Sequence, residues 1–199
     1  LDKRYLRDME KRGCRIVPTI WDAAYSAGEF GRWLAELNTN EIIIKPTVSA
    51  TAGHTYRLTA YDPSLEAVFA NRPFLVQPFM PNIIAEGEYS LFYFNGELSH
   101  AINKMPKPAD FRVQEEHGGI IAEIHPDADL LVAGRETVST IGRDLLYTRV
   151  DFVRDREGGF SLMELELIEP ALYLRMNSGA PRRFADAIVA RLRVDEKTT

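Results

Sequence analysis

The chain has little cysteine, no long apolar run and no excess of positive charge. Its single cysteine, Cys14, cannot form an internal disulfide, so the fold must depend on a hydrophobic core. No apolar stretch approaches the roughly 18 residues that a membrane helix needs, and no charged-then-apolar signal segment opens the chain. The formal net charge of -5 argues against a dedicated nucleic-acid binder. We therefore expect a cytoplasmic protein that binds neither membrane nor nucleic acid.

The composition is that of an ordinary globular protein. Among 199 residues, 45% are hydrophobic and 27% are charged, which is enough for a sizeable core. Apolar spacing predicts helices over residues 2–12, 28–37, 63–70, 127–146 and 181–196. In the first helix, Asp2 is the expected N-cap and Gly13 the expected stop.

Runs rich in β-branched or alternating apolar residues predict strands over residues 41–46, 74–81, 89–94, 97–104, 148–155 and 162–166. The dipeptide Asn95-Gly96 favours a type I′ turn, which predicts a hairpin between the third and fourth of these strands. Hairpins interleaved with helices indicate an α+β fold with antiparallel sheets.

The acidic run around Glu164 and Glu166 carries the strongest chemical signal. Alternate residues of a strand share a face, so these two carboxylates point the same way. Met163, Leu165 and Leu167 are then expected on the opposite face. If residues 156–159 close a symmetric hairpin, Asp151 lies directly opposite Glu164, and Arg149 lies opposite Glu166.

Three acids on one face repel one another and call for a compensating cation. Hard divalent ions prefer oxygen ligands, so Asp151, Glu164 and Glu166 are candidate metal ligands. In the alternative interpretation, Arg149 neutralises the acids, which simply face water. The hairpin alone leaves both interpretations open.

The order of the motifs is more specific than any one motif. Asp2-Lys3 opens a helix, Ile42-Ile43-Ile44-Lys45-Pro46 precedes a loop of small residues, and Val76-Gln77-Pro78-Phe79-Met80, Gly87-Glu88, Arg112, Asp151 and Glu164-x-Glu166 follow. This order resembles the ATP-grasp carboxylate-amine ligases, in the group that includes bacterial glutathione synthetase, the ribosomal-protein glutamate ligases and the cyclo-ligase of cycloserine biosynthesis. The resemblance extends from about Leu1 to Arg191. It implies an N-terminal domain before Leu1, which this chain does not contain.

The resemblance implies an ATP-grasp fold over residues 1–199, in which two α+β subdomains with antiparallel sheets clasp ATP between them. A smaller ATP-lid subdomain is expected at about residues 15–80. A larger C-terminal subdomain with the metal site is expected at residues 1–14 and 81–199.

The nucleotide-binding residues also follow from the resemblance. It implies that Lys3 and Lys45 hold the α- and β-phosphates, and that the loop containing Ser49, Ala50, Thr51 and Gly53 covers the triphosphate. An ammonium at the end of a triple-isoleucine strand is costly unless it faces water or an anion, which agrees with this role for Lys45.

The base and ribose contacts are expected further along the chain. Gln77, Pro78, Phe79 and Met80 match the segment between the two lobes, where the carbonyl of Pro78 would accept from the adenine amine and the N–H of Met80 would donate to the ring. Glu88 matches the acid that binds the ribose hydroxyls.

The catalytic and metal residues complete the comparison. Arg112 matches the arginine that contacts the transferred phosphate, and Lys104 is expected to assist it from a neighbouring strand. Asp151, Glu164 and Glu166 match the metal ligands, although Glu166 replaces the asparagine that is usual in the family.

The resemblance implies an ATP-dependent carboxylate-amine ligase, or an intramolecular cyclo-ligase, that acts through an acylphosphate on an amino-acid-like substrate. ATP and Mg²⁺, or Mn²⁺, would be its cofactors, and a small-molecule carboxylate and amine its partners. Ligases of this type often pair, so a homodimer is one alternative. Two other functions stay open: an ATP-grasp small-molecule kinase, and a nucleotide-binding fragment without turnover.

Overall fold

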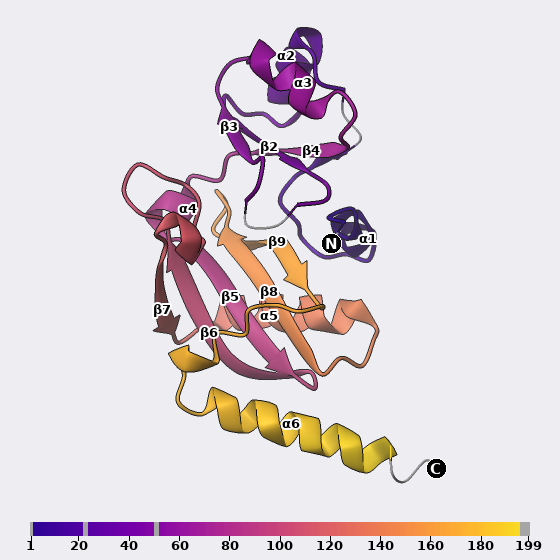
Figure 1. Cartoon of the computed structure of the whole chain (residues 1–199), viewed down its shortest axis with the longest axis vertical. Helices are drawn as coiled ribbons and strands as arrows, with labels where there is room; N and C mark the ends of the chain where they lie inside the picture. The colour runs from indigo at the N-terminus through magenta and orange to yellow at the C-terminus, as the bar shows by residue number, and fades with distance from the viewer. Residues whose placement is uncertain (1, 22–23, 50–51, 196–199) are drawn as a thin grey trace.

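Two antiparallel sheets and the helices that cover them make up the computed structural model, which describes residues 2–21, 24–49 and 52–195 (Figure 1). The strands are β1 (Ile20–Trp21), β2 (Ile42–Pro46), β3 (Tyr56–Leu58), β4 (Phe74–Pro78), β5 (Glu88–Phe94), β6 (Glu97–Met105), β7 (Ile120–Ile124), β8 (Tyr147–Arg154) and β9 (Phe160–Glu166). The α-helices are α1 (Tyr5–Lys11), α2 (Ala27–Glu36), α3 (Glu66–Phe69), α4 (Asn82–Ala85), α5 (Ala128–Ile141) and α6 (Ala180–Asp195). Short 3-10 turns are η1 (Pro63–Leu65), η2 (Glu115–His117) and η3 (Leu174–Met176). The predicted α+β class with antiparallel sheets is confirmed.

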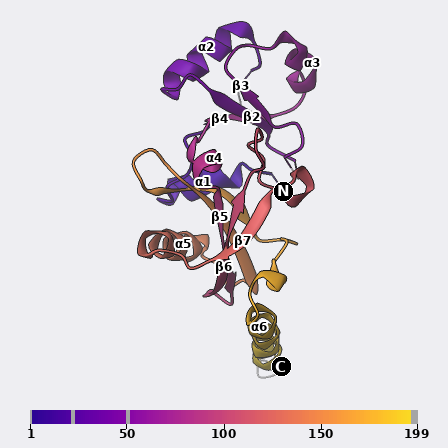
Figure 2. The ribbon, with the colours of Figure 1, turned by 90° about the vertical axis from the view of Figure 1, so that its left-hand side faces the viewer.

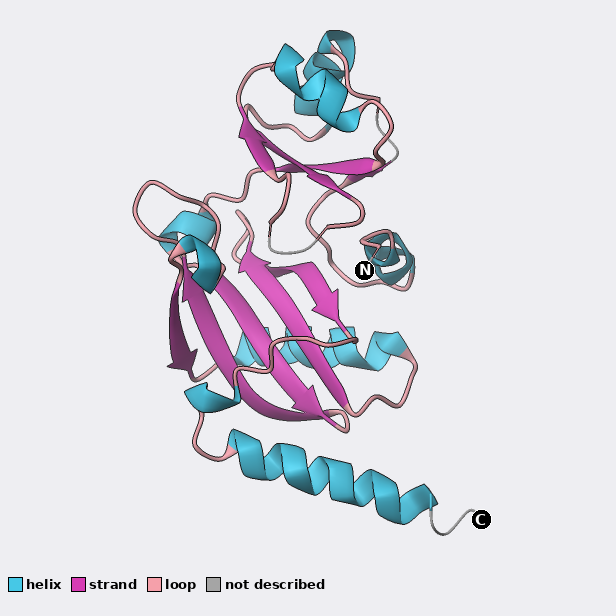
Figure 3. Cartoon of the chain, viewed as in Figure 1, coloured by secondary structure: helices cyan, strands magenta, loops and turns pink. Residues whose placement is uncertain are grey.

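The first sheet has the strand order β1-β4-β2-β3, and α2 and α3 cover its outer face (Figure 3). Strand alternation explains which side chains meet these helices. Ile42 and Ile44 of β2 are fully buried, and they join a hydrophobic cluster that contains Trp33 and Phe74. The alternate residue Lys45 therefore lies on the face turned away from the helices.

The second sheet has the order β7-β6-β5-β8-β9 and holds the largest hydrophobic cluster. Leu130 of α5 and Leu6 of α1 pack with Leu91 and Val150 of the central strands. Figure 2 shows α5 against one face of this sheet and α6 at its far end. There Phe184 of α6 lies 4.9 Å from the ring of Phe94.

Local sequence signals explain most element boundaries. Asn95 and Gly96 have φ values of 47° and 82°, as the predicted type I′ hairpin requires. The side chain of Asp127 caps the start of α5 by accepting from the N–H of Leu130. The prediction that this helix continues to residue 146 is wrong, because Gly142, with a φ of 64°, ends it at Ile141.

The predicted start of the first helix is also wrong. Helix α1 begins at Tyr5 and its N-cap is Arg4, without a capping side chain. Asp2 forms a bridge with Val48, and its carboxylate accepts from the backbone N–H of Arg4. Pairing with a distant loop therefore takes Asp2 out of the helix.

Strands β1, β3 and β7 were not predicted from the sequence. Strands β1 and β3 have only two and three residues, too few for a period of two to show. Strand β7 is a largely exposed edge strand, so burial imposes no alternation on it. Within the described residues, no helix is both long and apolar enough to cross a bilayer.

Candidate active site

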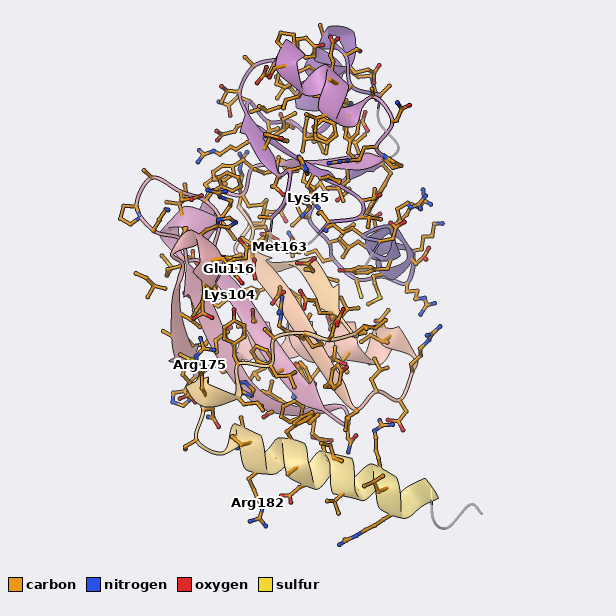
Figure 4. All side chains as sticks on the ribbon, in the orientation of Figure 1. Lys45, Lys104, Glu116, Met163, Arg175 and Arg182 are labelled. Carbon is orange, nitrogen blue, oxygen red and sulfur yellow. The ribbon has the colours of Figure 1, made fainter. Side chains whose placement is uncertain are left out.

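A cleft of about 480 Å³ lies between the two sheets. Its walls come from β2 and β4 above, from β5, β6 and β9 below, and from the loop between β6 and β7 at one side. Figure 4 shows Lys45 reaching into this region from the first sheet, with Met163, Glu116 and Lys104 beneath it. Segments far apart in the sequence therefore meet at one site.

One end of the cleft is apolar. The side chains that line it are Val17, Ile43, Phe79, Met80, Ile83, Phe111, Val113 and Met163. They also form a hydrophobic cluster of their own, separate from the cores of the two sheets. This end suits a flat, apolar group.

The backbone at this end offers a directed acceptor. Phe79 donates its N–H to the carbonyl of Glu41, which continues the ladder between β2 and β4. Hydrogen-bonding groups alternate from one side of a strand to the other, so the carbonyl of the preceding residue, Pro78, points away from β2. The buried side chain of Gln77 donates to the hydroxyl of Thr19 at 2.9 Å and so fixes this segment.

Lys45 is the cation that best marks an anion site. It is half-buried at the end of β2, and within the described part of the chain no hydrogen bond or ion pair engages its ammonium. Burial lowers the pKa of Lys45, and the nearby Lys3 adds to this, although Glu164 acts in the opposite direction. A desolvated ammonium without a close partner favours an incoming anion.

Lys3 lies beside Lys45 and fastens the loop after β2. Its ammonium donates to the carbonyl and hydroxyl oxygens of Ser49 at 2.9 and 3.0 Å, and lies 3.9 Å from Glu164. Its backbone N–H donates to the carbonyl of Thr47 at 2.7 Å. The N-terminal segment thus holds the small-residue loop against the cleft.

Glu88 and Lys104 form a buried ion pair in the floor of the cleft. They face each other on β5 and β6, and the Lys104 ammonium also lies 3.4 Å from Asp151. Burial opposes the charge on Lys104, but Asp151 and Glu88 outweigh it and raise the pKa of this lysine. Burial raises the pKa of Glu88, while Lys104 partly offsets that effect.

The three predicted metal-binding acids meet in the cleft. Ligand atoms of Asp151, Glu164 and Glu166 all lie within 4.8 Å of one another. The predicted register is confirmed, because Asp151 pairs with Glu164 and Arg149 with Glu166.

That register depends on a β-bulge. From the loop to Phe152 and Leu162 the pairing is shifted by one residue, and the extra residue of β9 is Met163. The prediction that Met163 points away from the acids is wrong. It lines the cleft and packs with Val153, whereas Leu165 joins the core beneath the sheet.

Arg149 holds the acids together. Its guanidinium donates to Asp151 at 2.9 Å and to Glu166 at 2.5 Å. Burial opposes ionisation of Asp151, but Arg149 and Lys104 outweigh it and hold its pKa below the usual value. For Glu166 the balance is reversed: burial, together with the nearby acids, raises its pKa to about 7 despite Arg149.

Each of the two interpretations of the acidic hairpin is therefore correct in part. Arg149 neutralises part of the charge, as the simpler interpretation expected, but the acids do not face open water. Asp151 is fully buried and Glu164 is only partly exposed. Carboxylate oxygens this close together fit a hard divalent cation.

The structure brings most of the predicted site residues to the cleft. Its lining includes Lys3, Lys45, Ser49, Gln77, Pro78, Phe79, Met80, Glu88, Lys104, Arg112, Glu164 and Glu166. Asp151 lies directly beneath them. In the loop after β2, the described residues that line the cleft are Ser49, Ala52 and Thr55, not Gly53. Ala50 and Thr51 lie outside the described residues.

Sequence reasoning missed several residues of the site. Apart from Phe79 and Met80, the apolar lining was not recognised, because its members come from five separate segments. Asp110, which pairs with Arg112 through both carboxylate oxygens, was missed as well. Its spacing of two residues from Arg112 was the available signal, since an aspartate commonly accepts from the backbone two residues on.

Comparison with known proteins gives close relatives. No family model matches the chain. It is 31% identical to the cycloserine biosynthesis protein DcsG of Streptomyces lavendulae, over 97% of this chain and 70% of DcsG. It is 24% identical to the glutathione synthetase of Bradyrhizobium diazoefficiens, over 65% of this chain and 41% of that enzyme.

Solved structures agree with these relatives. The crystal structure of D-cycloserine synthetase DcsG matches with a TM-score of 0.77 and 29% identity, over 96% of this chain and 70% of that chain. The ATP-grasp ligase PsnB, in a complex with Mg and ADP, matches with a TM-score of 0.69 and 17% identity, over 94% of this chain and 58% of its own. The likeness to PsnB is one of fold.

Proposed function

Because the chain belongs to the ATP-grasp ligases, we propose that its cleft binds ATP with Mg²⁺ and activates a carboxylate of an amino-acid-like substrate for attack by an amine. The protein is an ATP-dependent enzyme that forms C–N bonds. The observation that carries the proposal is the composition of the cleft, which is apolar at one end, cationic in the middle and acidic at a cluster of three carboxylates.

We divide the fold into two lobes. The smaller lobe consists of the sheet β1-β4-β2-β3 with α2 and α3, at about residues 15–80. The larger lobe consists of residues 1–14, which include α1, and of residues 81–199, which include the second sheet. The separate hydrophobic clusters of the two sheets support this division.

In this assignment the adenine lies at the apolar end of the cleft. The carbonyl of Pro78 accepts from the adenine amine and the N–H of Met80 donates to the ring. The direction of the Pro78 carbonyl and the flat apolar walls support this placement. Glu88 then binds the ribose, with Lys104 holding its carboxylate in place.

Lys3 and Lys45 bind the α- and β-phosphates, and Arg112 with Lys104 contacts the transferred phosphate. The loop that contains Ser49, Ala50, Thr51 and Gly53 covers the triphosphate. Two observations support these roles: no described residue pairs with the ammonium of Lys45, and Lys3 donates a hydrogen bond to Ser49.

Asp151, Glu164 and Glu166 are the ligands that we assign to Mg²⁺.

Among the described residues that line the cleft, cations and acids are equal in number. The cations are Lys3, Lys45, Lys104, Arg112 and Arg149, and the acids are Glu88, Glu116, Glu164, Glu166 and Glu169. A cleft with both signs of charge suits a ligand that carries phosphates and divalent cations together. Mn²⁺ accepts the same oxygen ligands and is an alternative.

The chemistry asks for positioning and charge stabilisation rather than a protein nucleophile. A substrate carboxylate oxygen attacks the γ-phosphorus, the bond to the bridging oxygen breaks, and ADP leaves. An amine then attacks the acyl carbon and displaces phosphate, and its proton passes to solvent or to the departing phosphate. Asp151, Glu164 and Glu166 would hold Mg²⁺, which would offset the phosphate charge, while Lys45 and Arg112 stabilise the charge that develops during transfer.

DcsG is described as a D-cycloserine synthetase. We therefore propose an amino-acid-derived substrate, with ring closure and chain extension as the two outcomes to distinguish. The use of ATP supports a cytoplasmic location. A homodimer stays a proposal, to be settled by light scattering.

The test has two stages. ATP with Mg²⁺ should raise the melting temperature, as a ligand selective for the native state must. A panel of D- and L-amino acids and their amides is then screened for ADP release that requires an amine. Glu164→Gln serves as the inactive control. ADP release without an amine, with a stable phosphorylated product, would indicate a kinase, and no stabilisation by nucleotide would contradict the proposal.

A further inference from the structure

The loop between β6 and β7 carries Arg112 into the cleft. Its neighbours Phe111 and Val113 help to line the apolar end, so the loop spans both the base and the phosphate regions. The guanidinium of Arg112 is more than a third exposed. A long side chain in that setting has many rotamers, and something must select the one that faces the ligand.

Asp110 makes that selection. One of its oxygens accepts from the backbone N–H groups of Phe111 and Arg112, at 2.8 and 3.0 Å, and from Nε of Arg112 at 3.0 Å. The other accepts from Nη2 of Arg112 at 2.9 Å. The same buried carboxylate thus fixes the turn of the backbone and the orientation of the guanidinium.

The pairing leaves part of the guanidinium available. A guanidinium has five N–H groups, and Asp110 takes two of them. Among the described residues, none of the other N–H groups of Arg112 has a recorded partner. They can reach an anion in the cleft while the opposite edge stays fixed. The hydrogen bonds from Arg112 hold the pKa of Asp110 well below its usual range, so the carboxylate remains charged.

The far side of the loop is equally constrained. Gly119 donates its N–H to the carbonyl of Gln114, and a Cβ at Gly119 would lie only 2.0 Å from the carbonyl oxygen of Val113. Any residue larger than glycine would therefore force the loop open. The turn at Asp110 and the close contact at Gly119 together give the loop one shape.

We infer that Asp110 is a positioning residue that orients Arg112 toward the γ-phosphate of ATP and so gives the enzyme its preference for ATP over ADP. This inference rests on the proposed function. Asp110 itself is not among the described residues that line the cleft. Its effect is carried by the guanidinium, whose fixed fork makes directed bonds to phosphate oxygens.

The decisive variant is Asp110→Asn. Asparagine keeps an oxygen that can accept from the backbone N–H groups of Phe111 and Arg112, so the turn survives. Its amide then faces Nη2 of Arg112 with donor against donor, which releases the guanidinium. Asp110→Glu retains the charge and should restore part of the function. Lys107→Ala is the matched control, since its ammonium lies 4.0 Å from Asp110 and is more than half exposed.

Affinities for ADP and for the non-hydrolysable imido analogue of ATP are measured by calorimetry with Mg²⁺ for each variant. In Asp110→Asn we expect the analogue to bind about tenfold more weakly and ADP within twofold of the wild type, as the loss of one charged hydrogen bond predicts. Arg112→Ala should show the same selective loss, and the double variant should lose no more than Arg112→Ala alone.

A merely structural role would weaken both nucleotides equally or lower the melting temperature. An unchanged preference in Asp110→Asn, a loss that adds to that of Arg112→Ala, or a wild type that binds the two nucleotides equally would overturn the inference. A wild type that binds neither nucleotide would instead overturn the proposed function.

Discussion

Lys45 is the residue whose environment is explained best by a ligand. Its ammonium lies half-buried in the cleft without a partner among the described residues, next to Lys3. Two neighbouring ammonium groups repel each other and so destabilise the folded chain, whereas an anion between them would bind strongly. A bound anion would therefore offset the repulsion between the two lysines.

Lys45→Ala should weaken ATP binding by about one to two orders of magnitude, the value of roughly 1.5 to 3 kcal/mol for a charged hydrogen bond. Adenosine binding should change little, because Lys45 is assigned to phosphate. Calorimetry with both ligands measures the difference, and Lys11→Ala, on the exposed end of α1, is the control. Equal loss for both ligands would move Lys45 away from the phosphates.

Asp151 and Glu164 differ in what surrounds them. Repulsion among the acids, taken alone, predicts that neutralising either one holds or raises stability. Asp151, however, is fully buried against Arg149, Lys104 and Ser90. Glu164 is more than a third exposed, and within the described ranges its ion-pair partner is Lys3, at 3.9 Å.

Asp151→Asn should therefore lower the free energy of unfolding by about 3 kcal/mol, because it leaves buried cations without their partner. Glu164→Gln should change it by less than about 1 kcal/mol. Denaturant unfolding without nucleotide compares the two, and both variants should lose Mg²⁺-dependent turnover. Equal stability of Asp151→Asn and the wild type would show that the buried pair contributes little.

At the scale of elements, strand β9 does two things that a regular strand cannot do. It keeps Glu164 and Glu166 opposite their partners on β8, and it inserts Met163 on the same side of the sheet. The extra residue therefore places an apolar side chain in the cleft directly beside the acidic ones. The bulge thus joins the acidic part of the cleft to its apolar end.

Met163→Ala should weaken adenosine and ATP by a similar factor, roughly tenfold, since about 1 to 2 kcal/mol of apolar contact is lost. In Lys45→Ala, by contrast, ATP binding should weaken and adenosine binding should change little. Fluorescence titration with both ligands provides the measurement. If only ATP were affected, Met163 would not contact the base.

His100 on β6 anchors the segment that follows β9. Its ring stacks on Phe92 at 4.3 Å, and Nε2 lies 3.0 Å from the carbonyl oxygen of Leu172. Tyr173, the next residue, lines the cleft with a φ of 46°, which is unfavourable for a non-glycine residue. The histidine therefore holds a strained segment in place.

Burial lowers the pKa of His100 below the ordinary 6.5, although its bond to Leu172 and the nearby Glu123 act against this, and Arg183 adds to it. The unfolded chain then binds a proton that the folded chain does not, so stability is lost as pH falls below about 6.5. The free energy of unfolding should fall less steeply between pH 7 and 5 in His100→Gln than in the wild type. Parallel curves would show that His100 titrates normally.

Helices and strands with a clear period of apolar residues were predicted from the sequence, and elements without such a period were not. The hairpin at Asn95 and the pairing of Asp151 with Glu164 were both predicted correctly. The bulge at Met163 could not be foreseen, because a shift of one residue has no local signature and depends on packing against residues from distant segments. Asp2 lies outside its predicted helix for a similar reason, since it pairs with Val48, which lies in another part of the chain.

At the scale of the whole molecule, nucleotide should draw the two lobes together. With spin labels on cysteines at Glu36 and Arg182 in a Cys14→Ser background, Mg²⁺ and ATP should shorten the mean distance and narrow its distribution. Both residues are exposed, one on each lobe. A pair at Glu136 and Arg182 within the larger lobe is the control, and an unchanged distance across the cleft would indicate a rigid site.

The path of the chain determines how such a movement can occur. The polypeptide passes between the lobes twice, before β1 and after β4, and the hydrogen bond from Gln77 to Thr19 ties the two passages together. Val17 and Phe79, which flank them, pack in the same cluster. We expect two adjacent backbone segments joined in this way to act as a hinge, which would permit rotation about one line and resist twisting or sliding. Because the same cluster lines the apolar end of the cleft, a group bound there would also set the angle at which the hinge comes to rest.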